Sequence, residues 1–488
     1  MGWQMNAEVF ETHTGIVVLV GDRAYKVKKP VVTDFLDFSS VERREQVCAR
    51  EVELNRRLAP ESYLGIAHFD NAGQCPAEPV IIMRRHPDSL RLTTLVATDE
   101  SVGDDVDDHI VRIAETLARF HERAERSPAI DERGTPPEIT ALWQENLTEL
   151  GRYGGTILST ERIAEVTRLA ARFISGRTEL FAERIADRRI VDGHGDLRAD
   201  DIFCLPEGPA LLDCLEFDDR LRHVDCVDDA AFLVMDLEFL GRNDLAAKFR
   251  SHYVRLTSGS EPNSLWHFYI SYRAVVRAKV DCIRFDQGVT DARSDAQRHL
   301  DIALTHLRSG TVRLVLVGGG PGTGKTTLAR ALSERMKADV ISTDDVRREL
   351  LESGIIEGSE GVFGGGLYLP DNVNAVYEHT LRRAATALAR GRSVILDGTW
   401  RDAGQRLRAA KVADEYSCPT VELVCEAPLS EAMDRISRRS GSTSDATPAI
   451  AAAMASDDHS WSTAHRIDTT RSLAESVHDA YELCCRAT

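Results

Sequence analysis

A glycine-rich loop with a single lysine lies at residues 319–326, in the stretch GGPGTGKT. The apolar segment TVRLVLVGGG leads into it and the helical pattern TTLARALSERM follows, so the loop joins a buried strand to a helix. Glycines let backbone N–H groups surround a phosphate, and the positive end of the following helix points at the same charge. The loop therefore predicts a nucleotide-phosphate site, and its context favours this over an ordinary glycine turn.

Two side chains of this loop have predicted chemical roles. Lys325 should reach the β- and γ-phosphates, and the hydroxyl of Thr326 should bind Mg²⁺. The predicted nucleotide-binding residues of the loop are Gly319, Gly320, Pro321, Gly322, Thr323, Gly324, Lys325, Thr326 and Thr327.

Two aspartates follow later strands of the same region. Asp344 ends the segment ISTD, at the carboxyl edge of a strand, where ligands of open α/β sheets bind. A carboxylate there can take a proton from an acceptor hydroxyl, and the alternative is that Asp344 or Asp345 caps the next helix. Asp397 ends the strand SVILD and is placed as a carboxylate beside Mg²⁺ would be.

Three arginines, Arg435, Arg438 and Arg439, precede the flexible segment GSTS at 441–444. Arginines four residues apart on a mobile segment can fold over a transferring phosphate and stabilise its charge. The alternative is a solvated basic helix face.

A second acidic constellation lies in the segment DGHGDLRADDIF, which is followed by ALLDCLEF. In kinases, one aspartate accepts the hydroxyl proton, a residue five positions on binds Mg²⁺, and an aspartate after a later strand binds Mg²⁺ again. Asp196, Asp201 and Asp213 fit that order. Three such carboxylates repel one another unless a cation lies between them, so their spacing indicates a divalent metal rather than acidic turns alone.

Residues N-terminal to this acidic constellation match the same kinase type of nucleotide site. Ala24 and Lys26 share one face of a strand, in the Ala-x-Lys pattern of a nucleotide-binding strand, and Lys28 lies on that face too. Either lysine can be the phosphate-binding one, and Lys26 is the one predicted. Glu51 lies on a helix that can offer it to the lysine, the alternative being an exposed glutamate on an amphipathic helix.

The elements that must position these residues differ between the two halves of the chain. After about residue 308, strands alternate with helices, which predicts an α/β domain with a doubly wound parallel sheet. Before it, an antiparallel hairpin, a helix over 41–58, a strand at PVIIMRR and a mostly helical stretch over 105–185 predict an α+β domain with two lobes. We therefore predict domains at 1–308 and 309–488.

Length and charge narrow the class of protein. The chain has 488 residues with 43% hydrophobic residues, which fits two or three globular domains. Its net charge of −18 argues against a nucleic-acid partner. No signal peptide and no run of about 18 apolar residues is visible, so we predict a cytoplasmic protein without a membrane partner. The sequence leaves the oligomeric state open.

The loop, TDDVR, VILDGT and the arginine segment give residues 311–488 a resemblance to small P-loop kinases related to polynucleotide kinase, zeta toxin and chloramphenicol phosphotransferase. The resemblance implies that Asp344 is the general base and that Arg347 contacts the substrate. It also implies that Arg435 and Arg439 are lid arginines.

Residues 1–308 resemble the aminoglycoside phosphotransferase branch of the kinase-like fold, through HGDL, LLDCLEF and DCVDDAA in that order. Two departures stand out: the metal-binding Asn of that branch is Asp201 here, and ETHTGIVVLVGDRAYK contains no GxGxxG loop. The order of the two parts resembles a bacterial family of two-domain proteins predicted to be phosphotransferases.

These observations predict an ATP-dependent phosphotransferase with two nucleotide sites, each using Mg²⁺, that acts on a hydroxyl of a small molecule. In the N-terminal site Asp196 is the predicted base, Asp201 and Asp213 bind Mg²⁺, and Lys26 with Glu51 binds ATP. One alternative is that the N-terminal part is a catalytically silent, ligand-sensing module that regulates the P-loop domain. Another is an ATPase that does conformational work on a partner protein.

Overall fold

The computed structural model describes residues 7–11, 15–31, 37–71, 74–98, 103–257, 259, 261–359, 365–438, 451–452 and 461–488. The chain forms two compact units. Unit 1 comprises Met1–Leu158, Ala182–Ser260 and Tyr269–Ala303, and unit 2 comprises Ser159–Phe181, Glu261–Phe268 and Leu304–Thr488. Among the described residues, no helix combines the length and apolar composition that crossing a bilayer requires.

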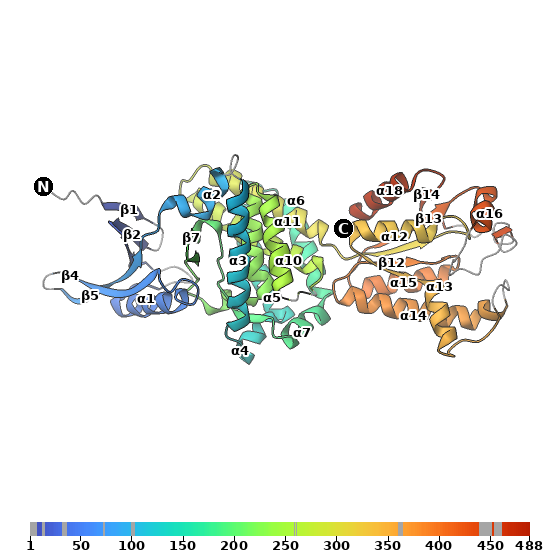
Figure 1. Ribbon diagram of the computed structural model, residues 1–488, viewed down its shortest axis with the longest axis horizontal. Coiled ribbons are helices and arrows are strands. Elements are labelled where there is room, and N and C mark those ends of the chain that lie inside the picture. Colours follow the sequence, from blue (N-terminus) through green and yellow to red (C-terminus); the bar gives the residue numbers. More distant parts are fainter. Residues whose placement is uncertain are drawn as a thin grey trace. The chain divides into compact units, whose positions relative to one another are not determined.

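Unit 1 begins with a five-stranded antiparallel sheet in the order β1-β2-β3-β5-β4 (Figure 1). Its strands are β1 (Ala7–Glu11), β2 (Gly15–Val20), β3 (Arg23–Lys28), β4 (Tyr63–Asn71) and β5 (Gln74–Arg84). The predicted hairpin is confirmed as the antiparallel pair β2–β3, in which Val17 lies opposite Lys26. Strands β1 and β4 were not predicted. Helix α1 (Val41–Asn55), capped by Ser40, packs Cys48 and Val52 into a core with β4 and β5.

The rest of unit 1 is mainly helical, as the sequence predicts for 105–185, with short strands around the HGD segment. The helices are α2 (Leu92–Thr98), α3 (Gly103–Arg123), α4 (Pro128–Asp131), α5 (Pro136–Gly151), α8 (Cys226–Phe239), α9 (Asn243–Leu256) and the larger parts of α7 (Thr178–Ala186), α10 (Asn263–Asp286) and α11 (Ala292–Ser309). The short strands are β6 (Ile190–Asp192), β7 (Ile202–Leu205), β8 (Gly208–Leu211) and β9 (His223–Asp225), with the 3₁₀ turn η3 (Ala199–Asp201) before β7. Together with the antiparallel sheet they make unit 1 an α+β unit, as the sequence predicts.

Unit 2 contains a five-stranded parallel sheet in the order β11-β12-β10-β13-β14, so the predicted doubly wound α/β fold is confirmed. The strands are β10 (Leu314–Gly318), β11 (Asp339–Ser342), β12 (Val394–Asp397), β13 (Thr420–Glu426) and β14 (His465–Asp468). Strand β14 was not predicted, because its sequence HRID buries only Ile467 and so lacks the apolar run of a central strand.

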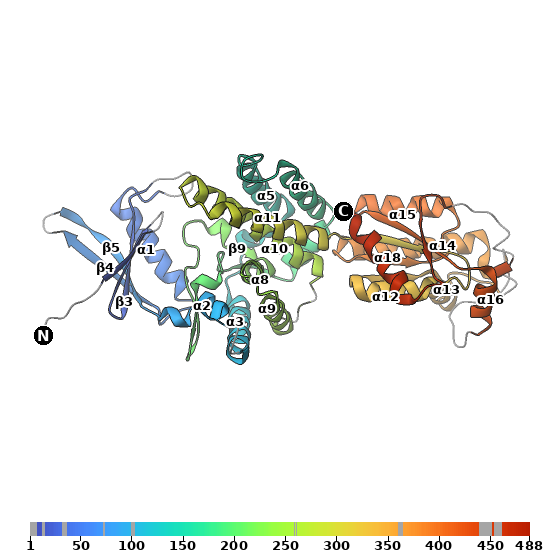
Figure 2. The ribbon, with the colours of Figure 1, turned by 90° about the horizontal axis from the view of Figure 1, so that it is seen from above.

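Helices cover both faces of this sheet (Figures 1 and 2). Leu314 and Leu316 of β10 pack against α14 (Pro370–Ala389) and α15 (Ala403–Glu415), while Val315 and Val317 face α12 (Lys325–Met336) and α18 (Leu473–Arg486). Helices α13 (Thr343–Glu352) and α16 (Leu429–Ser437) follow β11 and β13. Strands β10 and β12 are therefore buried on both sides, which explains the apolar run that marks β10 in the sequence.

Unit 2 also includes α6 (Thr160–Ser175), which precedes the sheet by more than a hundred residues. At its end, a Cβ on Gly176 would lie 2.1 Å from the carbonyl oxygen of Tyr416, so the two backbones touch. The buried Arg177 donates from Nη1 to the carbonyl oxygens of Gly176 (2.6 Å) and Tyr416 (2.7 Å), and its Nη2 lies 3.1 Å from Cys418 Sγ. Gly176 and Tyr416 cap the C-terminal ends of α6 and α15, so one guanidinium satisfies carbonyls at two helix ends.

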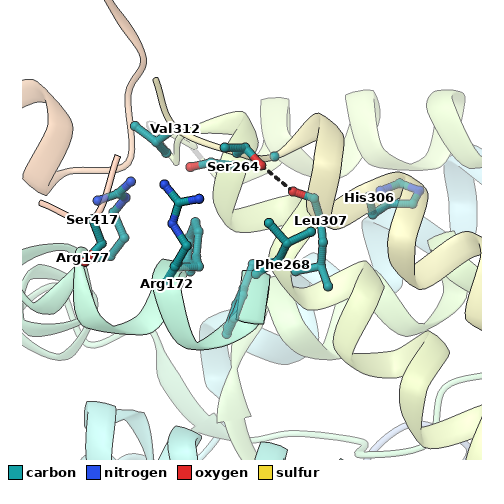
Figure 3. Close-up of a pocket in the computed structure, with 12 residues that line it drawn as sticks. Arg172, Arg177, Ser264, Phe268, His306, Leu307, Val312 and Ser417 are labelled. Atoms are coloured by element: carbon teal, nitrogen blue, oxygen red, sulfur yellow. Dashed lines mark hydrogen bonds between the residues drawn. The ribbon is translucent and has the colours of Figure 1, made fainter. Parts of the chain in front are cut away.

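Arg172 and Arg177 also line a cavity of about 20 Å³, whose lining includes Phe268 and Val312 (Figure 3). That volume holds about one water molecule, so the cavity is part of the packing between α6 and its neighbours. The predicted division at 308/309 remains a prediction, and the grouping of α6 with the parallel sheet is an addition that the sequence did not indicate.

We expect Arg177→Met to lower the free energy of unfolding by roughly 2–4 kcal/mol, because buried carbonyl oxygens lose a charged donor. Urea denaturation of the full-length chain, followed by circular dichroism, measures the change. Arg168→Met is the matched control, since Arg168 is an exposed residue of the same helix and should change stability by less than about 0.5 kcal/mol. Equal stability of the two variants would contradict a stabilising role for Arg177.

Candidate active sites

The phosphate loop of unit 2 lies between the buried end of β10 and the first residue of α12, Lys325. Gly322 and Gly324 adopt φ angles of 78° and 89°, the left-handed region that favours glycine. A Cβ on Gly322 would lie 2.3 Å from the carbonyl oxygen of Ala432, so this position has no room for a side chain. The loop is therefore tight enough to direct its backbone N–H groups inward at the helix N-terminus.

Lys325 and Thr326 both face this loop and its neighbouring strand. Lys325 Nζ donates to the carbonyl oxygen of Gly320 at 2.9 Å, and Thr326 Oγ1 donates to Asp397 Oδ2 at 2.6 Å. Asp397 is buried at the end of β12, which pairs directly with β10. Burial raises the pKa of Asp397, while the charge of Lys325 opposes the rise. A hydroxyl and a carboxylate oxygen this close match the hard oxygen ligands that Mg²⁺ prefers.

Asp344 lies in the first turn of α13, but it does not cap the helix. The cap is Ser342, whose Oγ accepts the Asp344 N–H at 3.3 Å, so the capping alternative for Asp344 and Asp345 is wrong. The carboxylate of Asp344 instead pairs with Arg347 Nη1 at 2.5 Å. Arg347 is only 8% exposed, and its guanidinium lies 4.6 Å from the ring centre of Tyr368. The predicted base and the predicted substrate contact are therefore adjacent, and Arg347 orients the carboxylate.

Arg435 is connected to the phosphate loop through Thr469, a residue that the sequence did not indicate. Its guanidinium donates to Thr469 Oγ1 at 3.2 Å and to the Thr469 carbonyl at 2.7 Å. Thr469 Oγ1 lies 2.7 Å from the carbonyl oxygen of Thr323, to which it donates. Arg438 is exposed and pairs with Asp434 at 3.4 Å, as a solvated basic face would. The predicted lid residue Arg439 lies outside the described residues.

In unit 1, the half-buried Lys26, the buried Lys28 and Glu51 form one ion-pair network. Lys26 Nζ lies 2.8 Å from Glu51 Oε1 and 2.7 Å from Asp213 Oδ1. Lys28 Nζ lies 2.6 Å from Glu51 Oε2 and also pairs with Glu216. Glu51 is fully buried, so the alternative of an exposed helix glutamate is wrong.

Both lysines therefore bind Glu51, and it is Lys26 that reaches the predicted metal ligand Asp213. Burial disfavours a charged Lys26, but Asp213 and Glu51 together raise its pKa well above the usual value. The same ammonium group lowers the pKa of Asp213, against the opposing effect of partial desolvation. The network is thus charged, and Asp213 is ready to act as a carboxylate ligand.

Asp229 of α8 fixes the backbone of the HGD segment, His194 to Asp196. Its carboxylate accepts the backbone N–H groups of His194 (2.7 Å) and Gly195 (2.8 Å) and contacts His121 Nε2 at 2.9 Å. Burial opposes the charge, but His121 and the backbone donors hold the pKa of Asp229 well below its usual value. His194 Nε2 contacts the Leu212 carbonyl at 3.0 Å, which ties the segment to the strand before Asp213.

Asp196 itself emerges from this fixed backbone with a side chain that is 33% exposed. It is therefore accessible to an acceptor hydroxyl while its main chain is held. The sequence pointed to Asp229 only through the DCVDDAA run, and it gave no signal for His121, which lies 108 positions away.

The predicted metal residues of unit 1 are close together, but side-chain cations lie among them. Arg198 Nη2 pairs with Asp201 Oδ2 at 2.7 Å, and Arg198 Nε lies 3.5 Å from Asp196 Oδ2. Burial raises the pKa of Asp201, the Arg198 guanidinium 2.7 Å away opposes the rise because it favours the ionised carboxylate, and the charges of Asp213 and Asp196 add to the rise. Within the described part of the chain, no three His, Cys, Asp or Glu side chains form a ready metal site. Carboxylate repulsion, from which the sequence argument inferred a metal, is here offset by Arg198 and Lys26.

An antiparallel sheet with its lysine–glutamate pair, a fixed HGD segment and a separate parallel sheet with a phosphate loop define a chain with a kinase-like domain and a P-loop kinase domain. Residues 314–457 match the family model described as AAA domain. The chain is 52% identical to an uncharacterized protein of Mycobacterium tuberculosis over 476 residues, which covers 98% of this chain and 95% of that protein. It belongs to the same family of two-domain proteins as that mycobacterial relative.

Solved structures resemble the two parts separately. A choline/ethanolamine kinase family protein from Mesorhizobium loti is 14% identical, with a TM-score of 0.38, and covers 63% of this chain and 94% of its own. A gluconokinase from Sinorhizobium meliloti is 17% identical, with a TM-score of 0.27, and covers 36% of this chain and 92% of its own. A cytidylate kinase from Methanococcus aeolicus is 28% identical over 126 residues, which covers 26% of this chain and 64% of that protein.

Proposed function

We propose that this chain is an ATP-dependent phosphotransferase that transfers the γ-phosphoryl group to a hydroxyl of a small molecule, with one nucleotide site in each domain. The observation that carries the proposal is the arrangement in unit 2, where the phosphate loop, the Thr326–Asp397 pair and the Asp344–Arg347 pair follow neighbouring strands of one sheet. Nucleotide, metal and acceptor groups thereby converge at the carboxyl edge of the sheet, where such ligands bind.

In the C-terminal site, Lys325 binds the β- and γ-phosphates and Thr326 with Asp397 holds Mg²⁺. The ion supplies charge neutralisation of the phosphates when it is bound. Asp344 accepts the proton of the acceptor hydroxyl, and Arg347 keeps that carboxylate in place while contacting the substrate. Arg435 binds phosphate oxygens from the loop side. Each role uses a side chain that already faces the site, so catalysis is mostly positioning.

In the N-terminal site, Lys26, held by Glu51, binds the phosphates, and Asp213 with Asp201 is the predicted Mg²⁺ pair. Asp196 is the base. We propose a small hydroxylated acceptor rather than a nucleic acid, because the chain carries a net charge of −18.

A mass-spectrometric screen tests the proposal. The full-length chain is incubated with ATP, Mg²⁺ and pools of hydroxylated metabolites, and products that gain one phosphoryl group are sought. The double variant Lys325→Ala/Asp196→Asn is the control, since it removes one essential group from each site. A product formed equally by this variant, or phosphate release without any phosphorylated product, would contradict transfer to a small molecule.

A thermal-shift experiment addresses the N-terminal site. The Lys325→Ala/Thr326→Ala background weakens nucleotide binding at the other site by removing its lysine and its metal-binding hydroxyl. In this background ATP with Mg²⁺ should raise the melting temperature of the full-length chain, since a ligand at 100 times its Kd adds about 2.7 kcal/mol to the free energy of unfolding. Asp213→Ala should abolish this rise, because it removes the carboxylate that faces Lys26. Asp187→Ala, an exposed aspartate of the same unit, is the control that should keep it.

A second candidate function has support in the same network. Lys26 is already paired with two carboxylates, and Arg198 forms an ion pair with Asp201. This arrangement also fits a catalytically silent module that senses a ligand and regulates the P-loop domain. The absence of any ATP-dependent melting shift in the background variant favours this candidate. Continuous phosphate release without a phosphorylated acceptor favours instead an ATPase that acts on a partner protein.

A further inference from the structure

Arg198 lies between the predicted base and a predicted metal ligand of the N-terminal site. Its Nη2 is 2.7 Å from Asp201 Oδ2, and its Nε is 3.5 Å from Asp196 Oδ2. Its side chain is 23% exposed and that of Asp201 is 16% exposed, so solvent screens this pair only weakly. The guanidinium is charged at any physiological pH, and it is therefore a built-in cation at this carboxylate.

The backbone is fixed at the two residues that follow Arg198, so this pairing is not a loosely placed surface contact. The Ala199 N–H donates to Asp236 Oδ2 of α8 at 2.8 Å. Arg91 Nη1 donates to the carbonyl oxygen of Asp200 at 2.6 Å. These contacts hold the 3₁₀ turn that carries Asp201 and keep Arg198 facing the site.

One donor of Arg198 is still available. Its Nε is buried and makes no hydrogen bond, although it lies beside the carboxylate of Asp196. A buried donor without an acceptor is costly, and a phosphoryl oxygen held next to the base would satisfy it.

Position 201, where this chain has Asp in place of the metal-binding Asn of the aminoglycoside phosphotransferase branch, is explained by the pairing with Arg198. An Asn offers a metal ion a neutral carbonyl oxygen and cannot form an ion pair, whereas Asp201 carries the charge that Arg198 binds. A divalent ion at Asp201 would have to displace this guanidinium or share the carboxylate with it, against the repulsion of the two positive charges. The carboxylate of Asp201 therefore serves as the ion-pair partner of Arg198.

We propose that Arg198 takes the place of a second metal ion in the N-terminal site: the site binds its nucleotide with one divalent ion, held through Asp213, while Arg198 neutralises Asp201 and directs Nε at the transferring phosphoryl group. This inference depends on the proposed function of the N-terminal domain. It removes Asp201 from the metal ligands that the kinase pattern assigns.

Counting bound Mn²⁺ tests the inference. The full-length Lys325→Ala/Thr326→Ala chain is titrated with Mn²⁺ in the presence of a non-hydrolysable ATP analogue, with bound ion counted by electron paramagnetic resonance and bound analogue by equilibrium dialysis. We expect one Mn²⁺ per bound analogue. Arg198→Met should admit a second Mn²⁺ at the freed Asp201, and Arg198→Lys should keep the count at one. Arg220→Met, which removes an exposed arginine paired with Asp218, is the control that should also leave one.

A second variant keeps the test decisive if Arg198→Met fails to fold. Asp201→Asn should leave one Mn²⁺ with an affinity changed less than about threefold, because Asp201 is not a ligand in this proposal. A drop of tenfold or more, or the loss of the ion, would show that Asp201 binds the metal and would overturn the inference, as would two Mn²⁺ ions in the background chain. Analogue bound without Mn²⁺ overturns this inference alone, whereas no bound analogue at all refutes the N-terminal nucleotide site itself.

Discussion

Replacing Lys325 with alanine should lower nucleotide turnover at the C-terminal site by at least about 10²–10³-fold, the scale seen when one preorganised group that stabilises transition-state charge is removed. The reason is local: Lys325 Nζ lies 2.9 Å from the Gly320 carbonyl and so stands over the loop where the β- and γ-phosphates bind. Backbone N–H groups and the helix N-terminus remain in the variant, so weak nucleotide binding should persist. Phosphate release and transfer by the full-length chain carrying Asp196→Asn measure this site by itself.

Lys411→Ala is the matched control for this prediction, because Lys411 is an exposed lysine of α15 in the same unit. Its turnover should equal that of the parent. Undiminished turnover in the Lys325 variant, with the Lys411 variant unchanged, would mean that the loop does not serve a reacting phosphate.

The Asp344→Asn variant should lose about 10²–10⁴-fold in the rate of phosphoryl transfer, the typical effect of removing a general base, and keep its nucleotide affinity. The amide preserves the shape and still accepts a hydrogen bond from Arg347, but it cannot take the proton of the acceptor hydroxyl. Because Ser342 caps α13, the helix start should survive the change. Rates from a coupled transfer assay and affinities from nucleotide titration separate the two effects.

Asp345→Asn provides the comparison, since Asp345 is the next residue in the same helical turn. It should retain transfer within a few-fold of the parent. A parallel loss of nucleotide affinity and transfer in the Asp344 variant would point to metal binding at Asp344 rather than proton acceptance.

The features that sequence predicted well are those that local patterns determine. The phosphate loop, β10 and α12 follow from glycines between an apolar run and a helical pattern, and β2–β3 follows from alternation around a tight turn. Lys26, Glu51, Asp196 and Asp213 were identified by their order along the chain, and the structure brings Lys26, Glu51 and Asp213 within ion-pair distance.

The features that sequence missed depend on distant partners. Thr469 follows an edge strand with no apolar run, and its role arises only because β14 lies beside β13 near the loop. Arg198 is three residues from Asp201, yet whether it faces the site or the solvent depends on Asp236 and Arg91, which lie far away in the chain. The helix cap shows a third kind of limit, since Ser342 and Asp344 are both good caps by residue type and only the backbone decides between them.

The joining of α6 to α15 through Arg177 has a consequence for how the chain is made. Arg177 and Tyr416 are 239 positions apart, so at about 5–20 residues per second the ribosome needs roughly 10–50 s between synthesising the two. During part of that interval Phe173 of α6 has emerged before its stacking partner Phe268 is made, and the C-terminal end of α6 has emerged before α15. A nascent chain in this state exposes an apolar, aggregation-prone surface. Slowed or stalled synthesis between these positions should therefore increase aggregation and chaperone binding. Synonymous codons that speed translation of this interval should therefore raise the yield of folded protein without changing a single residue.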